Sequence, residues 1–246
     1  MILHIPHSSL IIPDDLRDQF VLSDSELEKE KIVMTDMFTD ELYAFEGAES
    51  VIFPYSRLFV DVERFRSDAD EPMSKEGMGV AYNKTAVGNE LRHELLVEDK
   101  EHLLTQYYDL HHQKLTNAVQ AELDNNGKAL LIDCHSFPSV PLPCDNNQAT
   151  PRPPFCIGTE GEHTPEGLAS LTKKTLTDKG YEVGVNEPYA GSLVPTEFWQ
   201  KDYRVSSIMI EINRNLYMDE QTGLKIDSFE TIQKQIHQLL TILSRC

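Results

Sequence analysis

Two apolar segments of the chain end in residues that can do metal chemistry. Residues 2–5 are followed by His7 and Ser8, and residues 129–133 are followed by His135 and Ser136. Histidine nitrogen is a common zinc ligand, and a catalytic zinc takes three protein ligands and keeps one position open for water. The two histidines therefore indicate a metal-centred hydrolase, if the fold brings their strands together.

A third ligand has to come from another part of the chain. Asp36 is our prediction, and Glu63 and Asp133 are the alternatives. Asp133 precedes His135 by two residues, so it can instead be the carboxylate that orients this ligand. We therefore expect one zinc ion per chain at His7, Asp36 and His135, with another divalent metal as an alternative.

The histidines also have an ordinary interpretation. His7 and His135 would then cap helices or bond backbone groups at strand ends, as most buried polar groups do. Adjacent helical residues point to different faces, so at most one of His111 and His112 can line a site. A purely structural role is expected for the remaining histidines, which are His4, His93, His102, His163 and His237.

Glu211 lies inside the apolar run 206–212, where a buried carboxylate costs several kcal/mol unless it has a partner. One explanation is a structural pair with Arg214. The other is a carboxyl group with a raised pKa that acts as a general base on water. The residues alone leave both explanations open.

Arginines in polar loop contexts could clamp substrate carboxylates through paired hydrogen bonds. Salt bridges to the many acidic residues of this chain are the alternative for each of them. Other polar side chains near predicted strand ends add to the candidates. The predicted substrate-binding residues are Arg57, Arg64, His112, Tyr189, Asn213 and Arg214.

The elements that position these residues alternate along the chain. Apolar runs predict strands over 2–5, 51–53, 129–133, 155–158, 181–185 and 206–212, and helical spacing predicts helices over 23–45, 88–125, 164–179 and 228–243. This order predicts a three-layer α/β/α fold with a mixed, mostly parallel sheet. Ligands bind outside the carboxyl ends of strands in such sheets, where both strand-end histidines would lie.

The composition limits the other functions. The 246 residues are enough for one domain over 1–246, and the net charge of −19 argues against nucleic-acid or membrane-surface partners. No apolar segment approaches the roughly 20 residues that span a bilayer. The four cysteines show no CxxC spacing, and the N-terminus does not read as a signal peptide, so we expect a cytoplasmic enzyme.

The sequence also resembles the N-formylglutamate amidohydrolases, also called N-formylglutamate deformylases. The matching segments occur in the family's order over nearly the whole chain. They are residues 7–9, 35–36, 56–64, 107–112, 133–137, 186–191 and 210–214. The resemblance implies a fold similar to zinc carboxypeptidases and to the aspartoacylase and succinylglutamate desuccinylase group, with a zinc-bound water that attacks an amide carbonyl.

By this resemblance His7 and His135 bind the metal, Glu211 is the base, and three arginines (57, 64 and 214) hold substrate carboxylates. The carboxypeptidase group has an acid at the position of Leu10, so the third ligand here comes from elsewhere. The implied reaction converts N-formyl-L-glutamate and water to formate and L-glutamate, a step of histidine degradation.

Three alternatives to this reaction remain. The first is a related zinc amidase, carboxypeptidase-like in fold, that acts on another N-acyl amino acid. The second is a non-catalytic module that binds an acidic metabolite in the arginine-lined cleft. A metal-free hydrolase with Ser8 or Ser136 as nucleophile is disfavoured, since neither serine lies in a G-x-S-x-G context.

Overall fold

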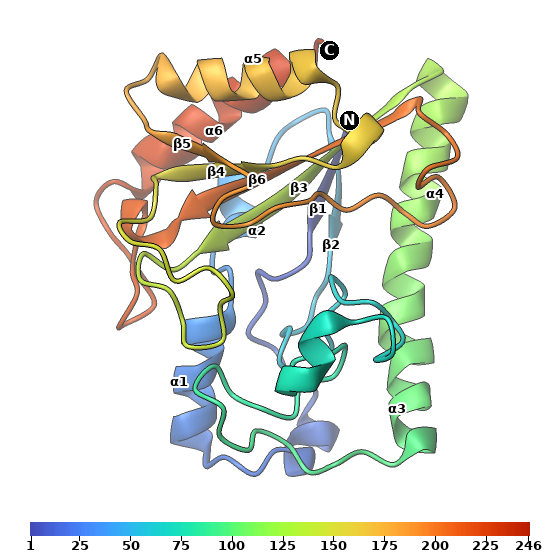
Figure 1. Ribbon diagram of the computed structural model, residues 1–246, viewed down its shortest axis with the longest axis vertical. Coiled ribbons are helices and arrows are strands. Elements are labelled where there is room, and N and C mark those ends of the chain that lie inside the picture. Colours follow the sequence, from blue (N-terminus) through green and yellow to red (C-terminus); the bar gives the residue numbers. More distant parts are fainter.

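The apolar runs form one six-stranded sheet in the computed structural model, which describes residues 1–246 (Figure 1). The strand order is β2-β1-β3-β6-β4-β5, and all neighbours are parallel except the antiparallel pair of β4 and β6. The prediction of a mixed, mostly parallel sheet is confirmed. The strands are β1 Ile2–Ile5, β2 Glu49–Ile52, β3 Ala129–Phe137, β4 Phe155–Gly158, β5 Val183–Val185 and β6 Val205–Asn213.

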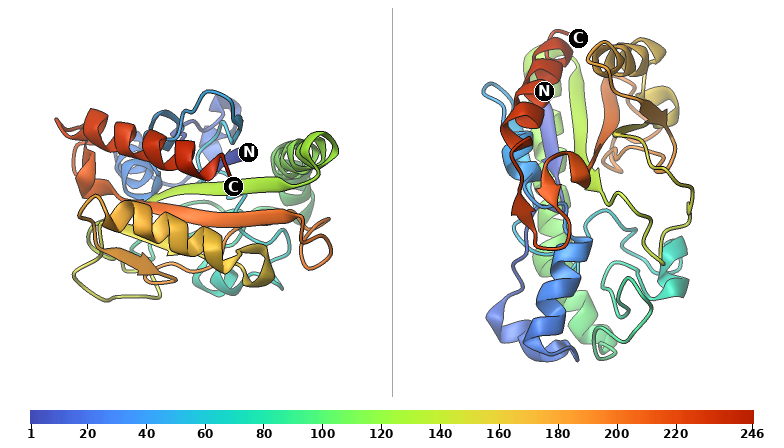
Figure 2. Two further views of the ribbon diagram at one scale, coloured as in Figure 1. Left: turned by 90° about the horizontal axis from the view of Figure 1, so that it is seen from above. Right: turned by 90° about the vertical axis from the view of Figure 1, so that its left-hand side faces the viewer.

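Helices cover both sides of the sheet (Figure 2). Side chains alternate between the two faces of a strand. On one face, residues such as Ile132 and Ile210 pack on α2 Thr39–Leu42 and α6 Phe229–Leu243, and α5 Glu166–Thr177 packs on α6, β4 and β5. On the other face, residues such as Leu131 pack on α4 Asp109–Asn126. None of the helices combines the length and the apolarity needed to cross a membrane.

The helix predicted over 23–45 is interrupted, and that part of the prediction is wrong. Ser23 caps α1 Asp24–Met34 with the expected capping box, but Thr35 is extended and Phe38 has a left-handed φ of 67°. The backbone N–H of Asp36 donates to the carbonyl of His7, 2.9 Å away. Tertiary contacts at Asp36 thus outweigh local helix propensity, which is a weak preference.

The helix predicted over 88–125 starts nine residues later than expected. Gly88 has a φ of +83°, and the backbone N–H of Leu91 donates to the carbonyl of Asn83 in an irregular loop, so residues 88–96 are not helical. The helical segment then comprises α3 Val97–Leu103, a π-helical turn over Leu104–Tyr108, and α4. A small antiparallel ribbon, β7 Met218–Asp219 and β8 Leu224–Lys225, completes the fold.

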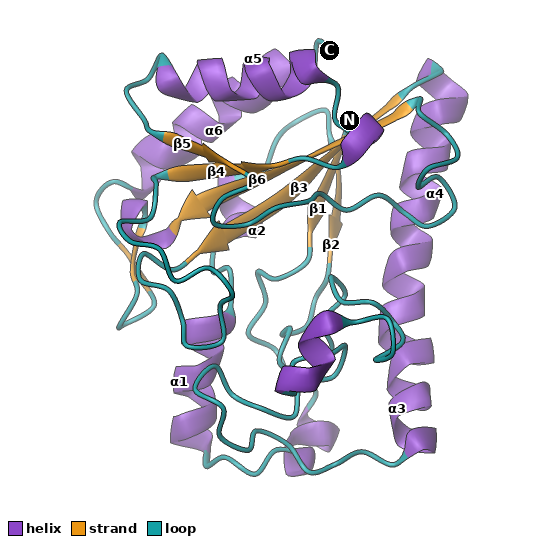
Figure 3. Ribbon diagram, in the orientation of Figure 1, coloured by secondary structure: helices purple, strands orange, loops and turns teal.

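Loops gather beyond the carboxyl ends of the central strands (Figure 3). The proline-rich segment after β3 and the segment between β5 and β6 both lack regular structure. In open α/β sheets this edge is where ligands bind. The sequence places its conspicuous polar residues at the same edge.

Candidate active site

The candidate site lies on the face of the sheet that α4 covers. In the register of the parallel strands, His4 of β1 is the partner of Asp133, and His135 of β3 is the partner of Glu211 in β6. Because Asp133 and His135 are two residues apart, their side chains point to the same face. Three neighbouring strands therefore present polar side chains to one region.

The three predicted metal ligands meet in this region. The candidate ligand atoms of His7, Asp36 and His135 lie within 4.8 Å of one another, and all three residues are buried. Nδ1 of His135 is 3.1 Å from Oδ2 of Asp36, and Nδ1 of His7 is 3.7 Å from the same oxygen. The break after α1 is what brings Asp36 to the two histidines.

Carboxylates fix both imidazoles in the orientation that metal binding requires. His7 donates from Nε2 to Oδ1 of Asp61 at 2.8 Å, which leaves its buried Nδ1 without any hydrogen-bond partner. Nε2 of His135 lies 3.2 Å from Oδ1 of Asp133. A carboxylate on the far nitrogen is the usual support of a metal-binding histidine. The unsatisfied nitrogen and the two-histidine, one-carboxylate donor set fit a zinc ion.

Asp36 is held as a carboxylate. Burial opposes its ionisation, but the hydrogen bond from His135, the nearby ring of His7 and the charge of Arg214 outweigh burial and hold its pKa well below the usual range. Arg214 donates from Nη2 to Oδ1 of Asp36 at 2.8 Å. Arg214 therefore pairs with the predicted metal ligand and forms no ion pair with Glu211.

Glu211 is only 6% exposed, and its Oε2 has no hydrogen-bond partner. Burial raises the pKa of Glu211 to about 8. Its carboxyl group lines the same cavity as the three clustered residues. A structural ion pair would instead lower a carboxyl pKa, so this environment favours the proton-transfer interpretation of Glu211.

The cavity has a volume of about 290 Å³, and its wall carries the predicted arginines at positions 57, 64 and 214. Arg57 donates to Oδ2 of Asp61 from Nε and Nη2, and Nε of Arg64 is 3.8 Å from the same oxygen. Two guanidinium groups thus share one carboxylate. Burial opposes ionisation of Asp61, but the charge of Arg57 and the hydrogen bond from His7 lower its pKa well below the usual range.

Of the other three predicted substrate-binding residues, only Tyr189 lines this cavity. Its hydroxyl accepts a hydrogen bond from Nη1 of Arg152 at 2.8 Å. His112 lines a neighbouring cavity instead, where Nε2 lies 2.8 Å from the carbonyl of Val62. Asn213 lines neither cavity and bonds backbone groups of adjacent loops.

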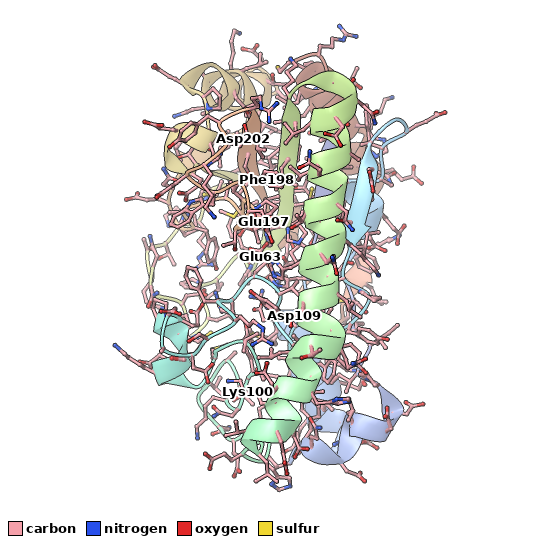
Figure 4. The ribbon with its side chains drawn as sticks, turned by 90° about the vertical axis from the view of Figure 1, so that its right-hand side faces the viewer. Glu63, Lys100, Asp109, Glu197, Phe198 and Asp202 are labelled. Carbon is pink, nitrogen blue, oxygen red and sulfur yellow. The ribbon has the colours of Figure 1, made fainter.

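His4, for which we expected an ordinary structural role, belongs to a second buried cluster beside the first. Its Nδ1 is 2.9 Å from Oδ1 of Asp133 and 3.1 Å from Oε1 of Glu63, and its Nε2 is 2.9 Å from Nε2 of His111. Figure 4 shows Glu63 on the flank of α4. The His4, Glu63 and Asp133 atoms are also close enough to hold a cation. The sequence contains a signal for this role of His4. His4 is a polar residue inside an apolar strand, as Glu211 is.

Asp133 serves both clusters. Its Oδ1 is shared by His4 and His135, and its Oδ2 accepts a hydrogen bond from the backbone of Leu193 at 3.0 Å. These contacts fit the orienting role that the sequence offered for Asp133. Asp36 is then the carboxylate that faces the Nδ1 atoms of His7 and His135.

Comparison with known proteins agrees with this architecture. The structure is similar to the N-formylglutamate amidohydrolase of Ralstonia eutropha JMP134, with a TM-score of 0.87, 24% identity, and coverage of 99% of this chain and 92% of the other. It is also similar to the gene product Atu2144 of Agrobacterium tumefaciens, with a TM-score of 0.64, 17% identity, and coverage of 99% and 91%. At these identities the likeness establishes the fold. No curated protein matches the chain in sequence.

The sequence itself matches a family model over residues 1–218. That model describes N-formylglutamate amidohydrolase and covers every residue of the two buried clusters as well as Glu211. The chain therefore belongs to the N-formylglutamate amidohydrolase family and is a hydrolase that acts on a linear amide bond.

Proposed function

We propose that the protein is a zinc-dependent amidohydrolase that cleaves N-acyl acidic amino acids, with N-formyl-L-glutamate as the first candidate substrate. One observation carries the proposal. Glu211, whose pKa is raised to about 8, opens into the same cavity as the converging donors of His7, Asp36 and His135. The products of the candidate reaction are formate and L-glutamate.

His7, Asp36 and His135 would hold the zinc ion, which as a Lewis acid lowers the pKa of a water molecule toward about 7 and polarises an amide carbonyl. The protein keeps these donors ready. Asp61 and Asp133 each occupy one imidazole nitrogen, which leaves Nδ1 of His7 and Nδ1 of His135, both facing Asp36, as the nitrogens that would bind the ion. Asp36 remains ionised beside Arg214.

Glu211 would accept a proton from the attacking water and deliver it to the leaving amine. A carboxylate with a raised pKa is a stronger base than an exposed one, and proton transfer by a positioned side chain is typically worth 10²–10⁴ in rate. The buried Oε2 of Glu211 has no protein partner, so it is free to take up the proton.

The arginines of the cavity also offset the repulsion between this acidic protein and an acidic substrate. A net charge of −19 repels a dicarboxylate substrate, so the site needs locally positive potential. Arg57 and Arg64 share the single carboxylate of Asp61, so this carboxylate neutralises only part of their positive charge. A substrate carboxylate can pair there with planar guanidinium groups through charge-assisted hydrogen bonds.

Formate release from N-formyl-L-glutamate tests the proposal. The protein is assayed as purified, after removal of metal with a chelator, and after zinc is restored. Activity that disappears with the metal and returns with zinc supports the proposal. No formate from a sample that holds one zinc per chain would contradict the assigned substrate, and the Glu211→Gln variant with zinc bound is the matched control for contaminating activity.

A further inference from the structure

A second cavity of about 410 Å³ adjoins the catalytic one. The two share four lining residues, Glu63, Arg64, Ala190 and Met209. Met209 lies two residues before Glu211 on β6 and points to the same face of the sheet. The second cavity therefore continues the catalytic cavity along the strands, toward α4. A substrate whose amide lies at the metal cluster would reach the second cavity past these four residues.

Apolar residues make up about half of the lining of this second cavity. Val62 and Leu193 contribute to its walls, and the large side chains of Phe65 and Trp199 line it while remaining 61% and 42% exposed. Exposed aromatic side chains that gather at a cavity are a common mark of a ligand site. Their exposure also means that truncating them leaves the core of the fold untouched.

Several polar groups of the second cavity already have protein partners, whereas Oε1 of Glu63 and Nε of Arg64, on the wall shared with the catalytic cavity, have no hydrogen-bond partner. Asp133 has three hydrogen-bond donors around it, Glu160 accepts a hydrogen bond from Nε1 of Trp199 at 3.0 Å, and Nε2 of His112 bonds the carbonyl of Val62. Three acidic side chains line the cavity, namely Glu63, Asp133 and Glu160. The only arginine is Arg64, on the wall shared with the catalytic cavity. A second carboxylate would meet like charges here, whereas an uncharged group would not.

Residues 190–196, in the segment between β5 and β6, form one wall of the second cavity. Hydrogen bonds and close packing hold this segment in place. Leu193 donates to Asp133 through its N–H and accepts from Oγ of Ser207 through its carbonyl at 2.7 Å. The carbonyl of Gly191 passes so close to Gly158 that a Cβ on Gly158 would lie 2.0 Å from it. The cavity is thus preformed, which spares a ligand the cost of ordering its walls.

We propose that the second cavity binds an uncharged, apolar group of the N-acyl amino acid whose amide lies at the metal cluster. This inference rests on the proposed function. The apolar group comes either from the acyl portion or from the amino-acid side chain, and both present the same chemistry to Phe65 and Trp199. A well-packed apolar group of this kind is expected to raise kcat/KM by roughly tenfold or more.

Two substrate series on the zinc-loaded enzyme test the inference and identify the source of the group. The first varies the acyl group on L-glutamate through formyl, acetyl, butyryl and benzoyl. The second keeps the formyl group and varies the amino acid through L-glutamate, L-alanine, L-leucine and L-phenylalanine. We expect kcat/KM to rise along one series, and the series that rises names the part of the substrate that enters the cavity. A rise along the second series would also replace the acidic amino acid of the proposed function by an apolar one.

Variants place the effect in the second cavity. Phe65→Ala and Trp199→Ala should each lower the ratio of kcat/KM between the largest and smallest substrate of that series by about fivefold or more. Val97→Ala is the control, because Val97 is 87% exposed and lines neither cavity. That variant should keep the wild-type ratio.

Each outcome of these experiments either supports or overturns the inference. Hydrolysis of N-formyl-L-glutamate without a gain in either series, or a gain that survives in both cavity variants, overturns the inference and leaves the proposed function standing. If no amide is hydrolysed with zinc bound, the proposed function fails, and calorimetric titration with N-benzoyl-L-glutamate and N-formyl-L-phenylalanine decides on the cavity. Weaker binding by Trp199→Ala than by the wild type then supports the inference, and equal or undetectable binding overturns it.

Discussion

His135 and Glu211 are register partners on the adjacent parallel strands β3 and β6. Backbone hydrogen bonds between the strands, about 4.8 Å apart, set the spacing of these two residues. A candidate metal ligand and a candidate base are thus fixed by the most rigid part of the fold. Function placed on sheet strands tolerates changes in the surrounding loops.

Replacing Glu211 by Gln should lower kcat by about 100-fold or more, because the amide cannot accept the proton of the attacking water. Zinc content, measured by mass spectrometry of the purified variant, should stay at the wild-type level. Loss of the metal together with activity would instead make Glu211 a ligand.

The same residue should govern how stability depends on pH in the metal-free protein. A carboxyl group whose pKa rises from 4.5 to about 8 on folding binds more protons in the folded state, so its contribution is fully present below pH 4.5 and is lost as pH rises toward 8. The loss is on the order of 4 kcal/mol. Urea unfolding at pH 5 and pH 8 should show this decline in the wild type and a smaller one in Glu211→Gln. Parallel pH profiles of the two proteins would refute the assignment.

Asp61→Asn should weaken zinc binding about 10- to 100-fold, since the charge that supports His7 is removed while the ligands stay in place. Competition with a chromophoric chelator measures the change. Tyr82→Phe is the matched control, because Tyr82 donates one hydrogen bond to the same carboxylate and its loss leaves the charge intact. Equal zinc affinity in Asp61→Asn and the wild type would remove Asp61 from the support of the site.

Arg57→Ala and Arg64→Ala should each raise the KM for an N-acyl dicarboxylate by about tenfold, the usual scale for a lost charge-assisted hydrogen bond. Arg66→Ala serves as the control, since Arg66 pairs with Glu101 and Asp109 at the surface and does not line the catalytic cavity. An unchanged KM in both cavity variants would exclude these arginines from substrate binding.

The strands were predictable because each contains a continuous apolar run, which is longest in β3 and β6. The apolar runs also made His135 and Glu211 conspicuous. Burying a polar side chain at the end of a strand or inside it costs free energy unless the side chain has a partner or a function. The local segment of Asp36 and the order of the family's motifs point to this residue as a ligand. The fold brings Asp36 close to His7 and His135. The sequence around Asp36 resembles a helix and does not indicate this proximity.

Other features depend on contacts between distant segments, and local patterns do not contain them. The break after Met34 exists because Asp36 bonds His7, His135 and Arg214. The link between His4 and Asp133 follows from the register of β1 against β3, which no short stretch specifies. Helical spacing of leucines over 88–96 was misleading, because Leu91 packs into the core from an irregular loop and Leu96 is exposed.

The sheet order also has a consequence for the assembly of the enzyme during synthesis. The strand β6 lies between β3 and β4, although it follows both in the chain, so a growing chain exposes the unpaired edge of β3 until residue 213 has emerged. Such an edge is open to pairing with other chains. We expect a chaperone or rapid late insertion of β6 to protect it, and we expect the pocket for the metal to close only when this last central strand has joined the sheet.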